Sequence, residues 1–288
     1  MIFNETFTLS NGVIIPKLAL GTWLVDDSMT AEAVRNAIKI GYRHIDTAQA
    51  YGNECGVGEG VRTSGISREE IFVTSKVAAE HKDYKSAAAS IDETLSKMKL
   101  DYLDMMIIHS PQPWKYVNQS DDRYAEGNRE AWSALTDAYK AGKLRAIGVS
   151  NFLQGDIESL CEVAEVKPMV NQILAHISNT PLELIDYCQK NDMIVEAYSP
   201  VAHGEAMKNP AIKDMAEKYR VSIPQLCIRY CLQLDMVVLP KTANLEHMKS
   251  NAELDFVISD EDMKLLMKVE HIKDYGEHSF FPVFGGKM

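Results

Sequence analysis

Hydrophobic and polar positions change their spacing in regular blocks along the chain. Short runs rich in β-branched and aromatic residues predict strands, and longer segments with apolar residues three or four positions apart predict amphipathic helices between them. Trp132, Leu135 and Tyr139, for example, mark one apolar helical face. The strand-like runs are KLALGTW, RHIDTA, IFVTSKV, LDMMIIH, RAIGVSN, KPMVNQI, MIVEAYS and DMVVLPK.

This alternation predicts an α/β fold in which about eight parallel strands close into a (β/α)8 barrel, the TIM barrel. No linker rich in Pro, Gly or Ser divides the chain, so we expect one domain over residues 1–288. An open, doubly wound sheet is the alternative. That fold normally carries G-x-G-x-x-G after its first strand, whereas GTWLVDDSMTAEA follows the first strand here.

Two segments lie outside the alternation. Near the start, Asn11-Gly12 separates two apolar runs and predicts a two-residue hairpin turn, in a small hairpin that covers the N-terminal mouth of the barrel. From about residue 270 the chain has no periodicity, but it keeps Phe280, Phe281 and Phe284. We expect this aromatic tail to fold back over the rest of the chain.

Composition and charge narrow the class of protein. With 46% apolar and 25% charged residues, the chain can bury a substantial core. The formal net charge of -11 argues against nucleic acid as a partner, since phosphate binding needs clustered Lys and Arg. The opening residues MIFNETFTLSNG lack a signal-peptide pattern, and no apolar run approaches the roughly 20 residues of a membrane span. We therefore expect a cytoplasmic protein with no membrane partner.

Cysteine and histidine spacing gives no sign of a metal site. The 5 cysteines are scattered without a CxxC pair, and the 8 histidines show no HExxH pattern. Cys227 and Cys231 lie four positions apart on a predicted helix, where two buried apolar side chains are the expected interpretation. We expect neither a disulfide framework nor a bound metal.

Polar residues at the predicted strand ends form the main functional signal. Each interrupts an apolar run, and strand interiors normally exclude acids, lysines and histidines. In a (β/α)8 barrel the carboxyl ends of all strands meet on one face, where catalytic groups gather. We interpret these residues as one active rim, made of Asp46, Lys76, His109, Ser150 with Asn151, Gln172, Tyr198 with Ser199, and Lys241.

Taken singly, each of these residues has a purely structural explanation. Asp46 suits a turn or helix cap, Lys76 could leave the barrel for solvent, and His109 could be a buried, hydrogen-bonded core histidine. Their coincidence on one predicted face favours a functional site over chance placement.

The motifs HIDTAQAYGNE, VTSKV, IIHSP, AIGVSNF, VNQI, AYSP and LPKT resemble, in this order, those of the aldo-keto reductase family, and bacterial-type members in particular. The resemblance covers essentially the whole chain. It implies a (β/α)8 barrel that binds NADPH across its C-terminal face without a Rossmann fold and reduces aldehydes and ketones to alcohols. It also implies a catalytic tetrad of Asp46, Tyr51, Lys76 and His109.

Elementary chemistry agrees with those implied roles. Hydride attack on a carbonyl carbon leaves an alkoxide that must be stabilised and protonated. The Tyr51 phenol can supply the proton, and a Lys76 ammonium at about 4 Å would favour its phenolate by roughly 4 kcal/mol before desolvation opposes the effect. Asp46 would keep Lys76 charged, and His109 would bind and orient the substrate oxygen.

The resemblance also assigns a cofactor site. Ser150, Asn151 and Gln172 would hold the nicotinamide carboxamide, and Tyr198 would stack on the ring. Lys241 and Thr242 match the residues that grip the 2′-phosphate, and Asn251 matches an adenine contact. The remaining assigned positions are Gly21, Thr22, Trp23, Ser199, Val201 and His247.

Two departures concern the phosphate grip. His247 stands where the family usually has an arginine, and Ser250 stands where it usually has a glutamate. Losing a guanidinium weakens phosphate recognition, although Lys249 lies close enough in sequence to compensate. We expect NADPH to be preferred, with measurable use of NADH.

Trp23, Trp114, Phe280 and Phe281 are expected to wall an apolar substrate pocket. Such a pocket discriminates weakly, so the expected substrates are a broad set of carbonyls: α-dicarbonyls, small aldehydes and ketones, and sugar-derived ketones. One alternative is a Schiff-base aldolase with Lys76 or Lys241 as nucleophile. Another is a non-catalytic, binding member of the same family. We expect a monomer, with a weak dimer as the alternative.

Overall fold

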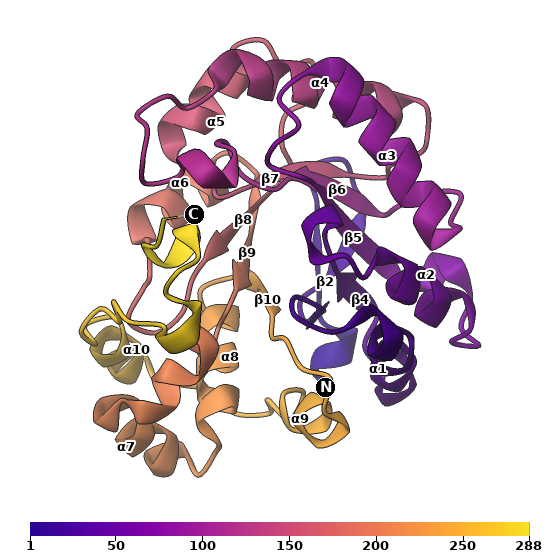
Figure 1. Cartoon of the computed structure of the whole chain (residues 1–288). Helices are drawn as coiled ribbons and strands as arrows, with labels where there is room; N and C mark the ends of the chain where they lie inside the picture. Colours follow the sequence, from indigo (N-terminus) through magenta and orange to yellow (C-terminus); the bar gives the residue numbers. More distant parts are fainter. Residues whose placement is uncertain (288) are drawn as a thin grey trace.

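In the computed structural model, which describes residues 1–287, eight parallel strands form one sheet in the sequential order β10-β9-β8-β7-β6-β5-β4-β3 (Figure 1). The strands are short and almost wholly buried, as parallel strands covered by helices must be. They are β3 (Leu20–Gly21), β4 (His44–Asp46), β5 (Phe72–Val77), β6 (Met105–Ile108), β7 (Ile147–Ser150), β8 (Val170–Leu174), β9 (Ile194–Tyr198) and β10 (Met236–Leu239).

The first and last strands of this sheet meet and close it into a barrel. Parallel bridges join Leu18 to Val238 and Gly21 to Lys241. The amide of Gly21 donates to the carbonyl of Pro240 at 3.0 Å, and the amide of Val238 donates to the carbonyl of Lys17 at 2.8 Å. The closed ring confirms the predicted (β/α)8 barrel and excludes the open, doubly wound sheet.

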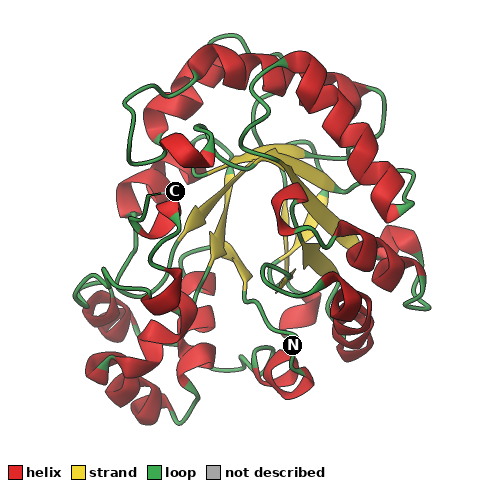
Figure 2. Cartoon of the chain, viewed as in Figure 1, coloured by secondary structure: helices red, strands yellow, loops and turns green. Residues whose placement is uncertain are grey.

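Helices surround the strands on the outside, as Figure 2 shows with red helices around a yellow ring. They are α1 (Asp27–Ile40), α2 (Glu54–Arg62), α3 (Tyr84–Met98), α4 (Ala125–Lys140), α5 (Gln154–Cys161), α6 (Leu182–Lys190), α7 (Pro210–Tyr219), α8 (Ile223–Leu232), α9 (Leu245–Ser250) and α10 (Asp260–Leu266). Short 3-10 turns are η1 (Ile2–Asn4), η2 (Gln49–Tyr51), η3 (Arg68–Glu70), η4 (Trp114–Tyr116), η5 (Ala202–Lys208), η6 (Gly276–His278) and η7 (Pro282–Phe284). No helix in residues 1–287 is long and apolar enough to span a membrane.

Capping residues mark where these helices begin and end. Asp83 caps α3 by accepting from the amide of Ser86 at 2.9 Å. Gly142 follows α4 with φ +76, a left-handed conformation that suits glycine at a helix C-terminus. Its amide donates to the carbonyl of Tyr139 and turns the chain toward β7.

The predicted N-terminal hairpin is present, but its turn differs from the predicted one. Strands β1 (Thr6–Thr8) and β2 (Ile14–Pro16) pair antiparallel. The amide of Gly12 donates to the carbonyl of Leu9 at 2.8 Å, so Ser10 and Asn11 are the central residues of the turn and Gly12 follows with φ +87. The loop is therefore longer than the expected Asn11-Gly12 turn, because Asn11 keeps a negative φ and only Gly12 is left-handed.

Asn11 also attaches the hairpin to the barrel. Its Nδ2 donates at 2.9 Å to the carbonyl of Arg145, two residues before β7 begins. Ile15 on β2 is fully buried in the core. The hairpin therefore contacts the N-terminal end of the barrel, opposite the strand ends that carry the polar residues.

The aromatic tail folds back over the opposite end. Asn118, in the loop after β6, donates from Nδ2 to the carbonyl of Pro282 at 2.7 Å. The hydroxyl of Tyr275 lies 2.9 Å from Nε2 of His176, and Tyr275 is 3% exposed. These contacts place the tail beside the loops that follow the strands.

Candidate active site

Asp46 and Lys76 form a buried ion pair at the C-terminal end of the barrel. Asp46 ends β4 and Lys76 lies on the neighbouring β5, so the strand pairing itself brings them together. Lys76 Nζ lies 2.7 Å from Asp46 Oδ1 and 2.8 Å from the carbonyl oxygen of Thr47. Burial lowers the pKa of Lys76, but the charges of Asp46 and Tyr51 outweigh burial and raise the pKa overall. Lys76 is therefore an ammonium at neutral pH.

Tyr51 projects toward this pair from η2, the turn after β4. Lys76 Nζ lies 5.0 Å from the centroid of the Tyr51 ring. Burial raises the pKa of Tyr51 above 10.0, and although the Lys76 charge acts in the lowering direction expected from the sequence, burial is the larger effect. The hydroxyl of Tyr51 is consequently protonated at neutral pH, which is the form that a proton donor requires.

His109 follows β6 and lies beside Tyr51. The two ring centroids are 5.7 Å apart, and the His109 ring is 5.1 Å from that of Trp114 in an edge-to-face arrangement. Burial and the charges of Lys76 and Lys82 lower the pKa of His109 well below 6.5. The imidazole is therefore neutral, and it can offer one N–H to an oxygen without adding charge.

Ser150, Asn151, Gln172 and Tyr198 form a connected polar group next to His109. Ser150 and Gln172 are register partners on β7 and β8, and Ser150 Oγ donates to the carbonyl of Gln172 at 2.8 Å. Asn151 Nδ2 donates to the carbonyl of His109 at 3.0 Å, and Asn151 Oδ1 accepts from the hydroxyl of Tyr198 at 2.7 Å. A patch of neutral hydroxyl and amide groups suits a neutral carboxamide better than a phosphate.

Gln172 lies in the middle of β8 rather than at its end, level with Ser150 at the end of β7. Its Nε2 donates to Asp46 Oδ2 at 3.0 Å and to Glu196 Oε2 at 2.8 Å. Glu196 on β9 is fully buried and was missed by the sequence argument, because it lies inside the run MIVEAYS. The sequence signal that could have identified Glu196 is an acidic residue inside a run predicted to be a buried parallel strand.

The remaining positions assigned to the cofactor lie along the loops that follow β3, β9 and β10. Thr22 Oγ1 donates to the carbonyl of Asp46 at 2.9 Å, and Ser199 Oγ lies 3.0 Å from Nε2 of His203 in η5. Val201 directly precedes η5. The structure therefore places these residues on the same face as the tetrad.

The predicted phosphate grip lies next to the barrel closure. Lys241 bridges to Gly21, and Thr242 Oγ1 accepts from the amide of Asn244 at 3.0 Å. His247 is exposed on α9, and Asn251 directly follows that helix. Lys249, the suggested compensating cation, pairs with Glu246 at 2.8 Å on the exposed surface.

An aromatic wall stands over the tetrad. Phe281 from the tail has ring-centroid distances of 5.0 Å to Trp114 and 5.5 Å to Trp23. Trp23 also lies 5.2 Å from the ring of His203. Phe280, in contrast, is 61% exposed, and among the aromatic rings of residues 1–287 it contacts that of Phe281 alone. The structure therefore brings Trp23, Trp114 and Phe281 together and leaves Phe280 at the surface.

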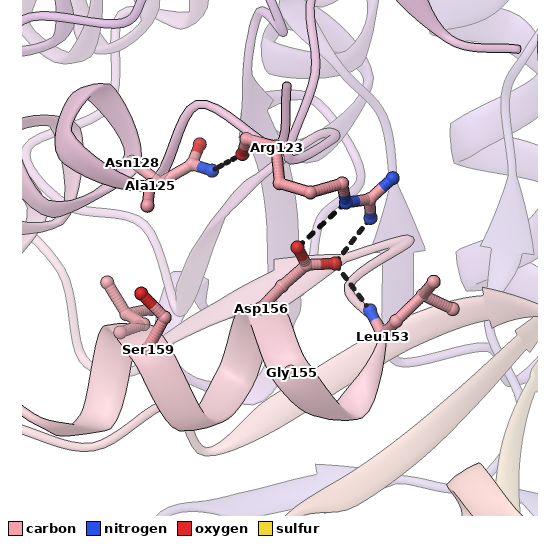
Figure 3. A pocket seen from close by; sticks show the side chains of 8 residues that line it. Arg123, Ala125, Asn128, Leu153, Gly155, Asp156 and Ser159 are labelled. Atoms are coloured by element: carbon pink, nitrogen blue, oxygen red, sulfur yellow. Dashed lines mark hydrogen bonds and ion pairs between the residues drawn. The ribbon is translucent and has the colours of Figure 1, made fainter. Parts of the chain in front are cut away.

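A separate cavity of about 310 Å³ lies between the starts of α4 and α5 (Figure 3). None of the four tetrad residues lines it. Arg123 and Asp156 both line it and are joined in a two-bond ion pair, with Arg123 Nε 2.9 Å from Asp156 Oδ1. Arg123 Nη1 also donates to Gln112 Oε1 at 3.0 Å, so this pair braces the loop that carries Trp114.

Comparison with known proteins identifies the class. The model of the Aldo/keto reductase family matches residues 17–271. The chain therefore belongs to the aldo/keto reductase family.

Individual relatives are similar to this chain over nearly its full length. Glyoxal reductase of Bacillus subtilis is 42% identical over 262 residues, covering 90% of this chain and 91% of the relative. The crystal structure of an aldo/keto reductase from Brucella melitensis superposes with a TM-score of 0.86 at 34% identity, covering 93% of this chain and 98% of the other. A Bombyx mori aldo-keto reductase in complex with NADP has a TM-score of 0.84 at 31% identity, covering 96% and 95%.

Proposed function

We propose that this protein reduces aldehydes and ketones, including α-dicarbonyls and sugar-derived carbonyls, with a hydride taken from NADPH. The observation that carries the proposal is the position of Tyr51, whose ring lies 5.0 Å from Lys76 Nζ of the buried Lys76–Asp46 pair and 5.7 Å from the ring of His109. A proton donor, a fixed positive charge and a neutral hydrogen-bond donor are the groups that a carbonyl oxygen needs as it becomes an alkoxide.

In this proposal each tetrad residue has its own role. Tyr51 gives its proton to the substrate oxygen, and in the reverse direction it takes that proton back. Lys76 stabilises the resulting phenolate, and Asp46 keeps the lysine charged and oriented. His109 donates a hydrogen bond to the substrate oxygen, and its neutral state leaves the positive charge of the site on Lys76.

Ser150, Asn151, Gln172 and Tyr198 would hold the nicotinamide end of the cofactor, which supplies the hydride when bound. Support comes from their connected hydroxyl and amide groups beside His109, and from the NADP complex of the Bombyx mori relative. Lys241 and Thr242 would hold the 2′-phosphate. Exposed His247 in place of an arginine supports a preference for NADPH that is incomplete, with some use of NADH.

The substrate class follows from the aromatic wall. Trp23, Trp114 and Phe281 surround the opening above the tetrad with apolar rings, and such walls tolerate many small carbonyl compounds. The glyoxal reductase name of the Bacillus subtilis relative is consistent with α-dicarbonyls as part of this range.

Two alternatives have less support. A Schiff-base mechanism needs a neutral amine, whereas Lys76 donates to both Asp46 and the carbonyl of Thr47 and is held as an ammonium. Lys241, the other candidate nucleophile, lies at the β3–β10 closure rather than on β5 beside Tyr51 and Asp46. A purely non-catalytic role would leave the paired charges of the tetrad without a purpose.

The test is an NADPH-consumption assay over a panel of aldehydes, α-dicarbonyls and sugar ketones. We expect turnover by the wild-type protein and a loss of at least about 100-fold in kcat for Tyr51→Phe, because the phenylalanine has no proton to give. NADPH binding by the variant, followed by fluorescence titration, should stay within a few-fold of wild type. Unchanged turnover in Tyr51→Phe would disprove the mechanism.

A further inference from the structure

A buried chain of hydrogen bonds leads from the tetrad to Glu196. Asp46 accepts from Lys76 Nζ through Oδ1 at 2.7 Å and from Gln172 Nε2 through Oδ2 at 3.0 Å. The same Gln172 Nε2 donates to Glu196 Oε2 at 2.8 Å. All four side chains are buried, and they come from four different strands of the barrel. Gln172 and Glu196 face each other because they are register partners on β8 and β9.

This chain determines which way the Gln172 amide points. A side-chain amide has two N–H donors on its nitrogen and acceptor sites on its oxygen. Both donors of Gln172 are directed at carboxyl oxygens, one on Asp46 and one on Glu196. A rotated amide would place Oε1 against the ionised carboxylate of Asp46 and leave that carboxylate with one fewer donor. The two contacts therefore hold Nε2 of Gln172 between Asp46 and Glu196, and they turn Oε1 away from both acids.

Glu196 can accept this hydrogen bond from Gln172 without adding a second negative charge beside Asp46. Burial, followed by the charge of Asp46, raises the pKa of Glu196 to about 8, while Gln172 and Lys76 act in the opposite direction. The facing imidazole of His44, with Nε2 at 3.9 Å from Glu196 Oε1, has its pKa lowered by burial to about 3 and is neutral. At neutral pH Glu196 and His44 thus add no charge beside the Lys76–Asp46 ion pair.

Among the amide oxygens of Asn151 and Gln172, the one without a hydrogen-bond donor is Oε1 of Gln172. Asn151 Oδ1 is occupied by the hydroxyl of Tyr198 at 2.7 Å. Within the part of the chain that the structure describes, no hydrogen bond to Oε1 of Gln172 is formed, although the residue is 2% exposed. An acceptor without a partner, in a residue that is almost wholly buried, is available to a donor from a bound molecule.

We propose that Glu196 is a positioning residue, which together with Asp46 orients the Gln172 amide so that its Oε1 accepts from the carboxamide NH2 of the nicotinamide. This inference rests on the proposed function, because it requires a nicotinamide cofactor. It adds a residue from β9 that touches neither cofactor nor substrate and acts through Gln172.

The experiment compares binding of NADP⁺ and of its 3-acetylpyridine analogue, in which a methyl group replaces the carboxamide NH2, by calorimetry. Wild type should bind NADP⁺ about tenfold more tightly, the value of one hydrogen bond. Glu196→Met removes the acceptor that holds Nε2 while keeping the side-chain length, and should reduce the ratio to about twofold or less. Glu196→Gln keeps an acceptor oxygen and should restore most of the ratio.

Two controls separate this role from a general loss of structure. Adenosine 2′,5′-bisphosphate lacks the nicotinamide, so its affinity should be the same in all Glu196 variants. Glu54→Gln changes another buried acid, which binds Ser75 and Thr94 outside the chain of bonds and should keep the wild-type ratio. If Glu196→Met does not fold, Glu196→Ala removes the same acceptor and carries the same expectation.

The outcomes distinguish the inference from the proposed function. Failure of wild type to bind NADP⁺ would overturn the proposed function itself. If wild type prefers NADP⁺ over the 3-acetylpyridine analogue and Glu196→Met shows the same ratio of affinities, only the role of Glu196 would be overturned. If wild type binds NADP⁺ and the 3-acetylpyridine analogue equally well, the role of Glu196 would also be overturned. Gln172 Oε1 would then accept no hydrogen bond from the carboxamide.

Discussion

Lys76 Nζ lies 2.7 Å from Asp46 Oδ1, and the two side chains are 0% and 5% exposed. A buried ammonium is stable only beside a compensating negative charge, because removing one partner leaves the other ion unpaired in a medium of low dielectric constant. The charge that Lys76 presents to Tyr51 therefore depends on Asp46.

Asp46→Asn keeps the shape of the side chain but removes its charge. We expect the pKa of Lys76 to fall and kcat/KM for carbonyl reduction to drop by about 100-fold or more, because Tyr51 loses its charged neighbour. Steady-state kinetics with NADPH measure this. Asp104→Asn is the matched control: Asp104 is equally buried and pairs with Arg68 and Arg145 away from the tetrad, so this variant should lose stability but keep kcat/KM.

The pH dependence should lack a histidine titration. The pKa of His109 is held well below 6.5 by burial and by the charges of Lys76 and Lys82, so the ring is neutral across the range in which a free histidine titrates. The rate of reduction should stay flat between about pH 5.5 and about pH 7.5. Alcohol oxidation should instead rise with pH, because it requires the phenolate of Tyr51, whose pKa lies above 10.0. A fall in reduction with a midpoint near pH 6.5 would contradict the neutral imidazole.

His247→Arg should strengthen selection for the 2′-phosphate. An arginine at this exposed position of α9 can form a charge-assisted, two-bond contact with phosphate, and we expect the ratio of kcat/KM for NADPH over NADH to rise about tenfold. Lys249→Ala should change the ratio little, because Lys249 is paired with Glu246. A wild-type ratio that favours NADH tenfold or more would refute the assigned phosphate grip.

Phe281 and Phe280 offer a matched pair of variants in the tail. Phe281→Ala removes a ring in contact with Trp23 and Trp114, so KM for apolar aldehydes should rise about five- to tenfold with little change in kcat. Phe280→Ala removes a mostly exposed ring and should leave both constants near wild type. Equal effects of the two substitutions would show that Phe281 does not line the substrate pocket.

Glu196 should make stability depend on pH. An acid whose pKa is raised on folding, here from 4.5 to about 8, releases its proton from the unfolded chain first, so folding becomes less favourable as pH rises between these values. Wild type should lose stability relative to Glu196→Gln by up to about 1.4 kcal/mol per pH unit in this window. Urea unfolding of both proteins at about pH 5 and about pH 8 measures the difference.

Much of the site could be predicted because chain order and barrel geometry agree. Asp46, Lys76 and His109 each interrupt an apolar run, and a closed parallel barrel brings such positions to one face. The family resemblance added Tyr51, which lies in a turn where spacing alone carries no signal.

Other features required the register and the packing. The hydrogen bond between Glu196 and Gln172 depends on the register of β8 and β9, and strand register is not readable from the run MIVEAYS. The contrast between Phe280 and Phe281 depends on the path of an aperiodic tail, which no hydrophobic pattern specifies. The sign of the Tyr51 pKa shift depended on burial, which a sequence does not quantify.

The bridges of Leu18 to Val238 and of Gly21 to Lys241 have a consequence for the order in which this protein is made. During synthesis the strands that carry Asp46, Lys76 and His109 emerge early, but the ring has no closing partner until Lys241 has left the ribosome. Until then β3 presents an unpaired edge that another strand could occupy. The residues proposed to bind the cofactor phosphate follow directly after this last strand, so they leave the ribosome only as the ring becomes able to close.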